Sequence, residues 1–261
     1  MRLAIVGLGK MGRSILKGLL DAGFLAPEEV GVLDRTPELT AERARAFGVR
    51  PLALSDLRQV ERVLIAVKPQ DFKRVARDLA HPGVGYLSIM AGVSTRRIAA
   101  ALGTRRVVRA MPNLAATIKK STTVLTALPE ARDAGDLVFA EGLFATVGSV
   151  HPLDEGLFDA FTAMSASAPA YLALVAEALA DGGVQMGIPR EAALRFAAEV
   201  LEATGALLAK KHPALLKDEV ASPAGTTIHG LKAIEEGGVR GALISAVAAA
   251  TARGRALGEE E

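Results

Sequence analysis

The sequence predicts an α/β protein in which an N-terminal Rossmann-type domain with a parallel sheet precedes an all-α dimerisation domain. The apolar run 3–6 leads directly into the glycine pattern 7–12 and then into a helical pattern. Further strand-like runs alternate with helical patterns, which is typical of parallel βαβ units. From Asp154 onward only helical periodicity remains. We therefore expect a dinucleotide-binding domain over residues 1–151 and a helical domain over residues 152–261.

Short apolar runs place the strands of the first domain. Leu3–Val6 and Val30–Leu33 are two such runs, and the helix between them is expected to end at Gly23. The remaining strands are expected at 63–67, 86–89, 107–110, 122–126 and 146–150, with helices at 72–79, 95–102 and 131–141. In the second domain, Gly and Pro separate helices expected at 171–179, 190–208 and 243–256, besides one ending near Glu236.

The glycine pattern is a complete G-x-G-x-x-G motif between a strand and a helix. Gly7 permits the tight turn, Gly9 removes a Cβ where a pyrophosphate approaches the backbone, and Gly12 lets the helix lie close to the strand. The helix N-terminus then faces the phosphates. The alternative is a structural turn with no ligand. The motif reads Gly7-Leu8-Gly9-Lys10-Met11-Gly12.

Asp34 ends the second strand, about 20 residues after the glycine motif, where ribose recognition occurs. Its carboxylate favours the free 2′-hydroxyl of NAD. Arg35 and Thr36 follow directly and favour the 2′-phosphate of NADP. The signals conflict; we expect NADPH and leave NADH open. In the alternative interpretation, this segment only caps a helix that begins near Pro37.

The next three strands each end in a loop with unusual residues. These loops are Lys68-Pro69-Gln70, 90–94 and Met111-Pro112-Asn113. In an open α/β sheet the carboxyl ends of the strands line the ligand crevice, so we expect the loops to border the cofactor. The alternative is that Pro and Gly only form turns after these strands and bind no ligand.

Composition excludes several classes of protein. The chain has no cysteine, and its four histidines show no ligand spacing, so we expect no metal site. A net charge of +2 with interspersed signs argues against nucleic-acid binding. The N-terminal apolar run is too short for a signal peptide, and we expect no uninterrupted stretch as long as a membrane span. The prediction is a cytoplasmic protein with a small-molecule substrate and no membrane partner.

The Ala-rich helices of the second domain have more apolar surface than a small bundle covers. We expect this domain to intertwine with a second copy and form a homodimer. Packing of the domain on its own nucleotide domain is the alternative.

A second informative segment is 218–227. Ser222 fits a helix N-cap and Pro223 the first helical position, which would leave the amides of Ala224, Gly225 and Thr226 free to bind a carboxylate. A well-capped structural helix is the alternative.

Neither tyrosine has a lysine four residues later, and no lysine lies between Lys120 and Lys210. This pattern favours reduction of a C=N bond, because a protonated imine accepts hydride without a strong enzymatic acid.

These features together resemble the pyrroline-5-carboxylate reductases over nearly the full length. The resemblance implies an enzyme that reduces 1-pyrroline-5-carboxylate to L-proline with NAD(P)H, the final step of proline biosynthesis. It also implies dimers assembled into a ring such as a decamer. The segments that carry the resemblance are 7–12, 67–69, 91–93, 109–113, 180–183, 186–190, 212–213 and above all 217–218 with 222–227.

The resemblance implies site residues. Thr227 contacts the imine nitrogen as the catalytic residue, and the substrate lies against Val220, Ser222, Gly225, Thr226 and Thr227. The cofactor is expected at Gly7, Leu8, Gly9, Lys10, Met11, Gly12, Asp34, Arg35, Thr36, Ala66, Val67, Lys68, Pro69, Ala91, Gly92 and Asn113.

The chain departs from the family pattern at two places. Ala166 and Ala168 replace glycines in a helix that borders the family's site, and Leu114-Ala115 replaces Thr-Pro after Asn113. Two other functions therefore stay open. One is a related imine or oxo-acid reductase with an altered pocket, and the other is a non-catalytic, redox-sensing binding module on the same fold.

Overall fold

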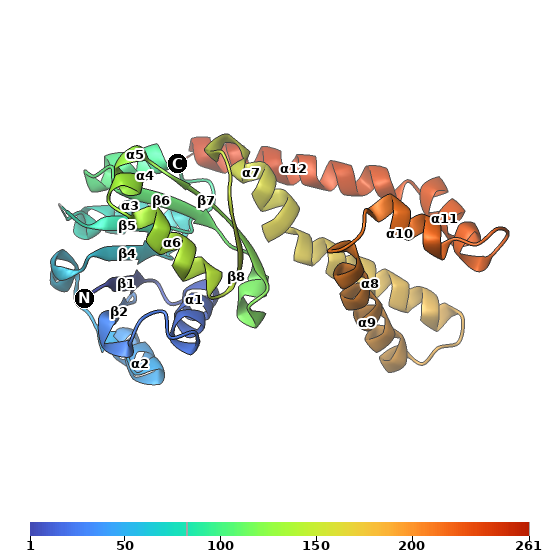
Figure 1. Ribbon diagram of the computed structural model, residues 1–261, viewed down its shortest axis with the longest axis horizontal. Coiled ribbons are helices and arrows are strands. Elements are labelled where there is room, and N and C mark those ends of the chain that lie inside the picture. Colours follow the sequence, from blue (N-terminus) through green and yellow to red (C-terminus); the bar gives the residue numbers. More distant parts are fainter. Residues whose placement is uncertain (82, 261) are drawn as a thin grey trace. The chain divides into compact units, whose positions relative to one another are not determined.

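The computed structural model describes residues 1–81 and 83–260 and forms two compact units (Figure 1). Unit 1 comprises residues 1–166 with 250–261, and unit 2 comprises residues 167–249. Residue 261, the last of the predicted helical domain, lies outside the described residues. The expected functional boundary after residue 151 stays a prediction.

Unit 1 is built on an eight-stranded sheet with the order β3-β2-β1-β4-β5-β6-β7-β8 among the described residues. All neighbouring strands are parallel except β6 and β7, which are antiparallel. The strands are β1 (Leu3–Val6), β2 (Val30–Leu33), β3 (Arg50–Pro51), β4 (Arg62–Ile65), β5 (Gly85–Ser88), β6 (Val107–Met111), β7 (Ser121–Ala127) and β8 (Gly148–Pro152). The predicted Rossmann-type sheet is confirmed.

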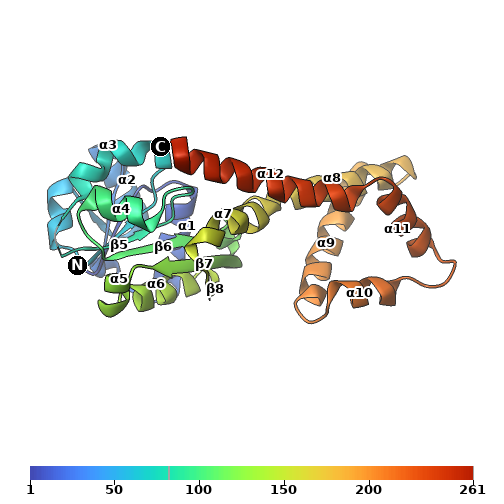
Figure 2. The same ribbon diagram turned by 90° about the horizontal axis from the view of Figure 1, so that it is seen from above.

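Helices cover both faces of this sheet. The side chains of β1 alternate between two cores: Leu3 and Ile5 pack with α1 and α6, whereas Ala4 and Val6 pack with α3 and α4. Figure 2 shows α3 and α6 on opposite sides of the sheet. The helices are α1 (Lys10–Asp21), α2 (Pro37–Phe47), α3 (Pro69–Leu79), α4 (Thr95–Leu102), α5 (Pro129–Asp133), α6 (Asp136–Ala145) and α7 (Phe158–Phe161).

Shorter turns complete unit 1. The 3₁₀ turns are η1 (Pro27–Glu29), η2 (Leu54–Gln59), η3 (Leu114–Ile118) and η4 (Glu155–Leu157), and η5 (Thr162–Ala166) is a turn of π-helix. The helix expected at 131–141 is instead two helices, because Gly135 takes a left-handed conformation with φ +73° between them. The two-residue strand β3 was missed because so short a segment has no periodicity.

Unit 2 is helical, and α12 continues from it into unit 1. Its buried core consists of Ala180, Ala193 and Ala197, where α8 meets α9. Large apolar side chains such as Leu174 and Ile244 are 67% and 65% exposed in the single chain. These exposed faces are those expected of a subunit that associates with another copy. The helices are α8 (Ala168–Gln185), α9 (Arg190–Leu208), α10 (Pro213–Val220), α11 (Thr226–Glu236) and α12 (Val239–Glu260).

The helical run 155–185 is long and apolar enough to cross a membrane by length and composition alone. The expectation that no stretch reaches this length is therefore wrong. The run passes from α7 through the turn of π-helix into α8, and Pro169 lies in the first turn of α8, where proline does not break a helix. A single apolar helix of this kind also suits a subunit interface.

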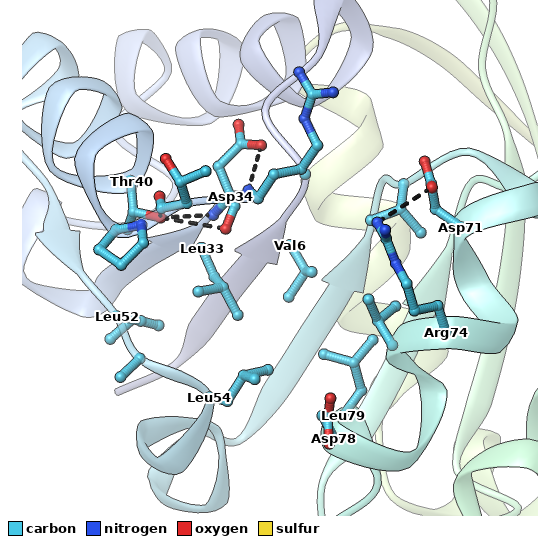
Figure 3. Close-up of a pocket in the computed structure, with 17 residues that line it drawn as sticks. Val6, Leu33, Asp34, Thr40, Leu52, Leu54, Asp71, Arg74, Asp78 and Leu79 are labelled. Carbon is cyan, nitrogen blue, oxygen red and sulfur yellow. Dashed lines mark hydrogen bonds and ion pairs between the residues drawn. The ribbon is translucent and has the colours of Figure 1, made fainter.

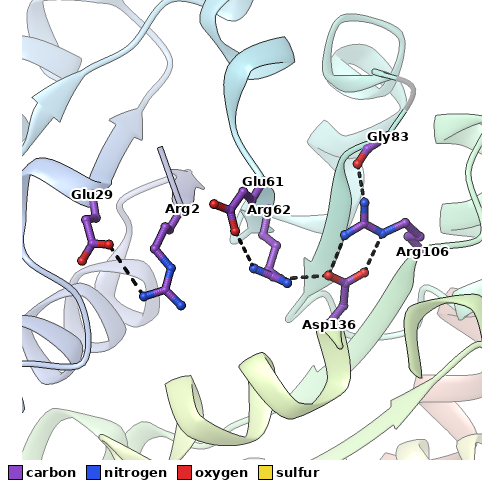
Figure 4. A network of polar contacts seen from close by, with 7 residues as sticks. All are labelled: Arg2, Glu29, Glu61, Arg62, Gly83, Arg106 and Asp136. Carbon is purple, nitrogen blue, oxygen red and sulfur yellow. Dashed lines mark hydrogen bonds and ion pairs between the residues drawn. The ribbon is translucent and has the colours of Figure 1, made fainter. Parts of the chain in front are cut away.

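A buried carboxylate joins α6 to the amino ends of the strands (Figure 4). Asp136 is fully buried and accepts hydrogen bonds from Arg62 Nε at 2.8 Å and from Arg106 Nε and Nη2 at 2.9 and 2.8 Å. These bonds raise the pKa of Arg106. A Cβ at Gly85 would lie 2.7 Å from the Asp136 carboxylate oxygens, so glycine is needed there. This network is structural and lies at the edge of the sheet opposite the glycine turn.

Candidate active site

Two glycines of the motif are required by the fold itself. Gly7 has φ +93°, and its amide donates to the Leu33 carbonyl at 2.8 Å. A Cβ on Gly7 would lie 2.8 Å from the Ala66 carbonyl oxygen, and one on Gly12 would overlap the Gly7 carbonyl. The tight turn and the close approach of α1 predicted for these positions are therefore present.

Gly9 differs, because nothing in the protein requires it to be glycine. Its φ and ψ of −65° and −168° are open to any residue, and a Cβ there would meet no atom within 4 Å. Gly9 is also the N-cap of α1 and gives that helix no side-chain hydrogen bond. The free amides at this N-terminus and the open space beside Gly9 suit an anionic group such as a pyrophosphate.

A cavity of about 640 Å³ lies beside this turn (Figure 3). It opens at the carboxyl ends of β1 and β2, with Asp34 on one side and Asp71 and Arg74 on the other. Apolar side chains including Leu52 and Leu54 form its floor. The mixture of apolar lining and a few polar groups fits an adenosine moiety.

The Asp34 carboxylate is directed back to the glycine turn. Oδ2 accepts from the Leu8 amide at 3.2 Å and Oδ1 from the Arg35 amide at 2.8 Å. Thr36 caps α2 by accepting from the Leu39 amide at 3.2 Å, as the capping alternative expected. The Arg35 side chain is exposed and lines the cavity, with no ion pair among the described residues. Capping and cofactor binding are thus compatible in this segment.

The other predicted cofactor loops lie at the same edge of the sheet. Strands β1, β4 and β5 pair in register, so the residues after each strand emerge side by side. Lys68 is the N-cap of α3, Gly92 turns with φ +73°, and Asn113 donates from Nδ2 to Ser165 Oγ at 3.1 Å. The structure therefore gathers the predicted cofactor residues of unit 1 along the carboxyl edge; Ala66, Val67, Pro69 and Ala91 belong to the same loops.

The predicted substrate segment lies in unit 2, between α10 and α11. Ser222 is not the N-cap of a helix, and Pro223 is not its first residue: α11 begins at Thr226, with Gly225 as its N-cap. The reason is Ala224, whose left-handed φ of +57° interrupts the helical path. The Gly225 amide, expected to be free, donates to the Ser222 carbonyl at 3.1 Å.

The start of α11 nevertheless keeps open backbone donors. Thr226 and Thr227 occupy its first turn, which has no side-chain cap and no acidic residue. A Cβ on Gly225 would overlap the Ser222 hydroxyl, so that hydroxyl lies directly beside the turn. Val220 ends α10 and is 60% exposed. These residues form one polar turn with an apolar edge.

The sequence analysis did not predict the contact of His229 with the turn before α11. Its Nδ1 lies 2.9 Å from the Gly225 carbonyl oxygen, one helical turn earlier in the chain. The spacing of four residues from the glycine turn was the available signal, because such residues share a helix face.

The comparisons with known proteins agree with this arrangement. A family model described as pyrroline-5-carboxylate reductase dimerisation matches residues 155–257, and one described as NADP oxidoreductase, coenzyme F420-dependent, matches residues 2–92. A pyrroline-5-carboxylate reductase of Thermus thermophilus is 66% identical over 100% of both chains. One of Arabidopsis thaliana is 34% identical over 99% of this chain and 96% of its own.

Solved structures show the same architecture. A 1-pyrroline-5-carboxylate reductase from Streptococcus pyogenes has a TM-score of 0.86 at 31% identity, covering 98% of both chains. A pyrroline carboxylate reductase from Plasmodium falciparum with NADP bound has a TM-score of 0.87 at 24% identity, covering 99% of this chain and 98% of its own. At 24% identity, the match to the Plasmodium falciparum structure supports the fold alone.

Gly9→Ala and Gly12→Ala form a pair that tests the glycine turn. Since a methyl on Gly9 meets only open space, we expect an unchanged melting temperature and an affinity for NADPH at least about tenfold weaker, equivalent to about 1.4 kcal/mol. A methyl on Gly12 overlaps the Gly7 carbonyl, so that variant should lose thermal stability. Fluorescence titration and thermal unfolding measure the two effects. Unaltered NADPH binding by Gly9→Ala would show that no phosphate approaches this glycine.

Proposed function

The chain belongs to the pyrroline-5-carboxylate reductase family, and from this premise we propose that it reduces 1-pyrroline-5-carboxylate to L-proline with NAD(P)H, the final step of proline biosynthesis. The observation that carries the proposal is the 66% identity to a named reductase over the whole of both chains. The open glycine turn and the turn before α11 are the two local features that this reaction needs.

The residues of unit 1 fit a nicotinamide dinucleotide. The α1 N-terminus at Gly9 would hold the pyrophosphate, and the cavity at Asp34 and Arg35 would hold the adenosine half. The cofactor, when bound, supplies the hydride. We propose NADPH as the preferred form, with NADH also accepted. Arg35 is exposed and has no ion pair among the described residues, so it is available to a 2′-phosphate, whereas the Asp34 carboxylate already accepts from the Leu8 amide.

We assign the substrate to the turn before α11. The amides of Gly225 and Thr226 with the Ser222 hydroxyl would bind its carboxylate, although Gly225 must first release the Ser222 carbonyl. Val220 would contact the ring. Thr227 would hold the imine nitrogen and thereby aim the adjacent carbon; its hydroxyl is too weakly acidic to donate a proton outright at neutral pH.

The family model for dimerisation covers α8 to α12, so the helical unit is a dimerisation domain. We further propose that the dimers assemble into a ring such as a decamer and that the enzyme works in the cytoplasm. The exposed apolar residues of unit 2 support association. The partner is then another copy of this chain, with a small molecule as substrate.

An assay of NADPH and NADH oxidation tests the proposed activity. With 1-pyrroline-5-carboxylate we expect turnover and a higher kcat/KM for NADPH than for NADH. The homologous six-membered imine, piperideine carboxylate, is the matched control and should react more slowly. Faster turnover of the larger ring would identify a related imine reductase, and no turnover with either would identify a binding module.

Arg35→Ala tests the cofactor preference. Loss of one charge-assisted hydrogen bond to the 2′-phosphate should weaken NADPH by about 1.5 to 3 kcal/mol while leaving NADH nearly unchanged. The matched control is Arg45→Ala, an exposed arginine of α2, the helix that follows Arg35, which does not line the cavity. Dissociation constants from fluorescence titration decide the question. Equal weakening of NADPH and NADH binding would show that Arg35 does not contact the 2′-phosphate.

Thr227→Val keeps the side-chain shape and removes the hydroxyl. We expect kcat/KM for the imine to fall by about 1 to 3 kcal/mol, roughly tenfold to a hundredfold, with the melting temperature unchanged. Ser222→Ala should act mainly by raising KM. Wild-type kinetics in Thr227→Val would contradict the assignment, and a loss of stability that parallels the loss of activity would make this threonine a structural residue.

A further inference from the structure

The loop 90–94 connects β5 to α4 at the carboxyl edge of the sheet. The strand order β2-β1-β4-β5 places Asp34 on one side of the glycine turn and this loop on the other. A dinucleotide with its pyrophosphate at the turn spans both sides, with adenosine toward Asp34 and nicotinamide toward the loop. Gly92 turns the loop with φ +73°, which glycine adopts without strain, and segments from elsewhere in the chain contact the loop at Gly92 and at Thr95 directly after it.

One of these contacts is a carboxylate from a segment 60 residues away. Glu155 accepts hydrogen bonds from the Thr95 amide and the Thr95 hydroxyl, both at 2.7 Å. Thr95 is buried and is the first residue of α4, directly after the loop. The two oxygens of Glu155 therefore hold the point where the loop enters the helix.

Glu155 is itself held by Arg109 of β6. Arg109 is 4% exposed, donates from Nη1 to Glu155 Oε1 at 3.2 Å, and lies over the Phe158 ring with 4.7 Å between the guanidinium carbon and the ring centroid. Its Nε and Nη2 are buried without a hydrogen-bond partner among the described residues. Glu155 is thus the counter-ion of a buried cation, and loss of its charge leaves that cation unpaired.

The end of α12 contacts the loop from another direction. A Cβ on Gly258 would lie 2.9 Å from the Gly92 carbonyl oxygen, so only glycine permits this approach. Arg97 of α4 donates from Nη1 to the Gly258 carbonyl. The loop and the residue directly after it are therefore in contact with two segments that come from far along the chain.

We propose that Glu155 is a positioning residue which, together with the Gly258 end of α12, holds the loop 90–94 in place for the nicotinamide half of the cofactor. A loop already held in its binding conformation has less entropy to lose when the cofactor binds. The proposal rests on the proposed function, which supplies the cofactor.

Glu155→Gln tests this role, because a glutamine keeps only one acceptor oxygen for the two Thr95 donors. We expect the dissociation constant for NADPH to rise about tenfold, because part of the binding free energy must then be used to order the loop. Adenosine 2′,5′-bisphosphate carries only the adenosine half, so its affinity should not change. Fluorescence and calorimetric titrations of the full-length protein measure both.

Two further variants separate positioning from stability. Asp136→Asn alters a second arginine-bound carboxylate, which is buried at the opposite edge, so it should lower the melting temperature and leave NADPH binding unchanged. Gly258→Ala changes no charge and lies near the end of α12, which can shift away from the loop, so the melting temperature should change little while NADPH binding weakens. Gly241→Ala, on the same helix with no atom near the added methyl, is its control and should bind normally.

Unchanged NADPH affinity in both Glu155→Gln and Gly258→Ala would overturn the proposal. Equal weakening of NADPH and the bisphosphate by Glu155→Gln would also overturn it, since the effect would then be general. These titrations measure binding without turnover. A wild-type protein that binds NADPH but does not reduce 1-pyrroline-5-carboxylate would refute the proposed function and leave the positioning role intact.

Discussion

The close packing of the glycine turn is the constraint on which the rest of unit 1 depends. Gly12 must lie against the Gly7 carbonyl, and Gly7 against Ala66 of the neighbouring loop, at distances that exclude any side chain. This packing sets the direction of α1 relative to β1. It also brings the N-terminus of α1 to the edge where the parallel strands end, which makes that edge the one suited to an anionic cofactor.

Two carboxylates bound to arginines attach helical segments to opposite edges of the sheet. Asp136, at the start of α6, is bonded to Arg62 of β4 and to Arg106, which directly precedes β6, and it serves the structure alone. Glu155 is bonded to Arg109 and to α4, directly beside a cofactor loop. The same chemistry, a carboxylate paired with an arginine where one partner is buried, therefore has a local consequence that depends on which edge it occupies.

Local patterns predicted most of the fold. The strands β1 and β2 and the helices α4 and α9 occur at the residues expected, because each has a clear period or cap. The tight turn at Gly7 and the close approach of α1 at Gly12 were also predicted correctly from the glycine motif. The N-cap at Ser222 was wrong, since the left-handed backbone of an alanine has no sequence signal. Glu155 and its contact with Thr95 were missed because long-range pairs leave no local pattern.

The turn to which we assign the substrate has little tertiary packing within one subunit. Neither α10 nor α11, which flank the turn, has a buried residue in the single chain. Apolar side chains such as Leu215 and Ile228 lie open on these helices. Helices of this length are marginal in water without tertiary packing, so an isolated subunit could not hold the turn in one geometry. Burial of these faces against another copy would order the two helices, so the proposed substrate site needs the dimerisation domain for its geometry as well as for assembly.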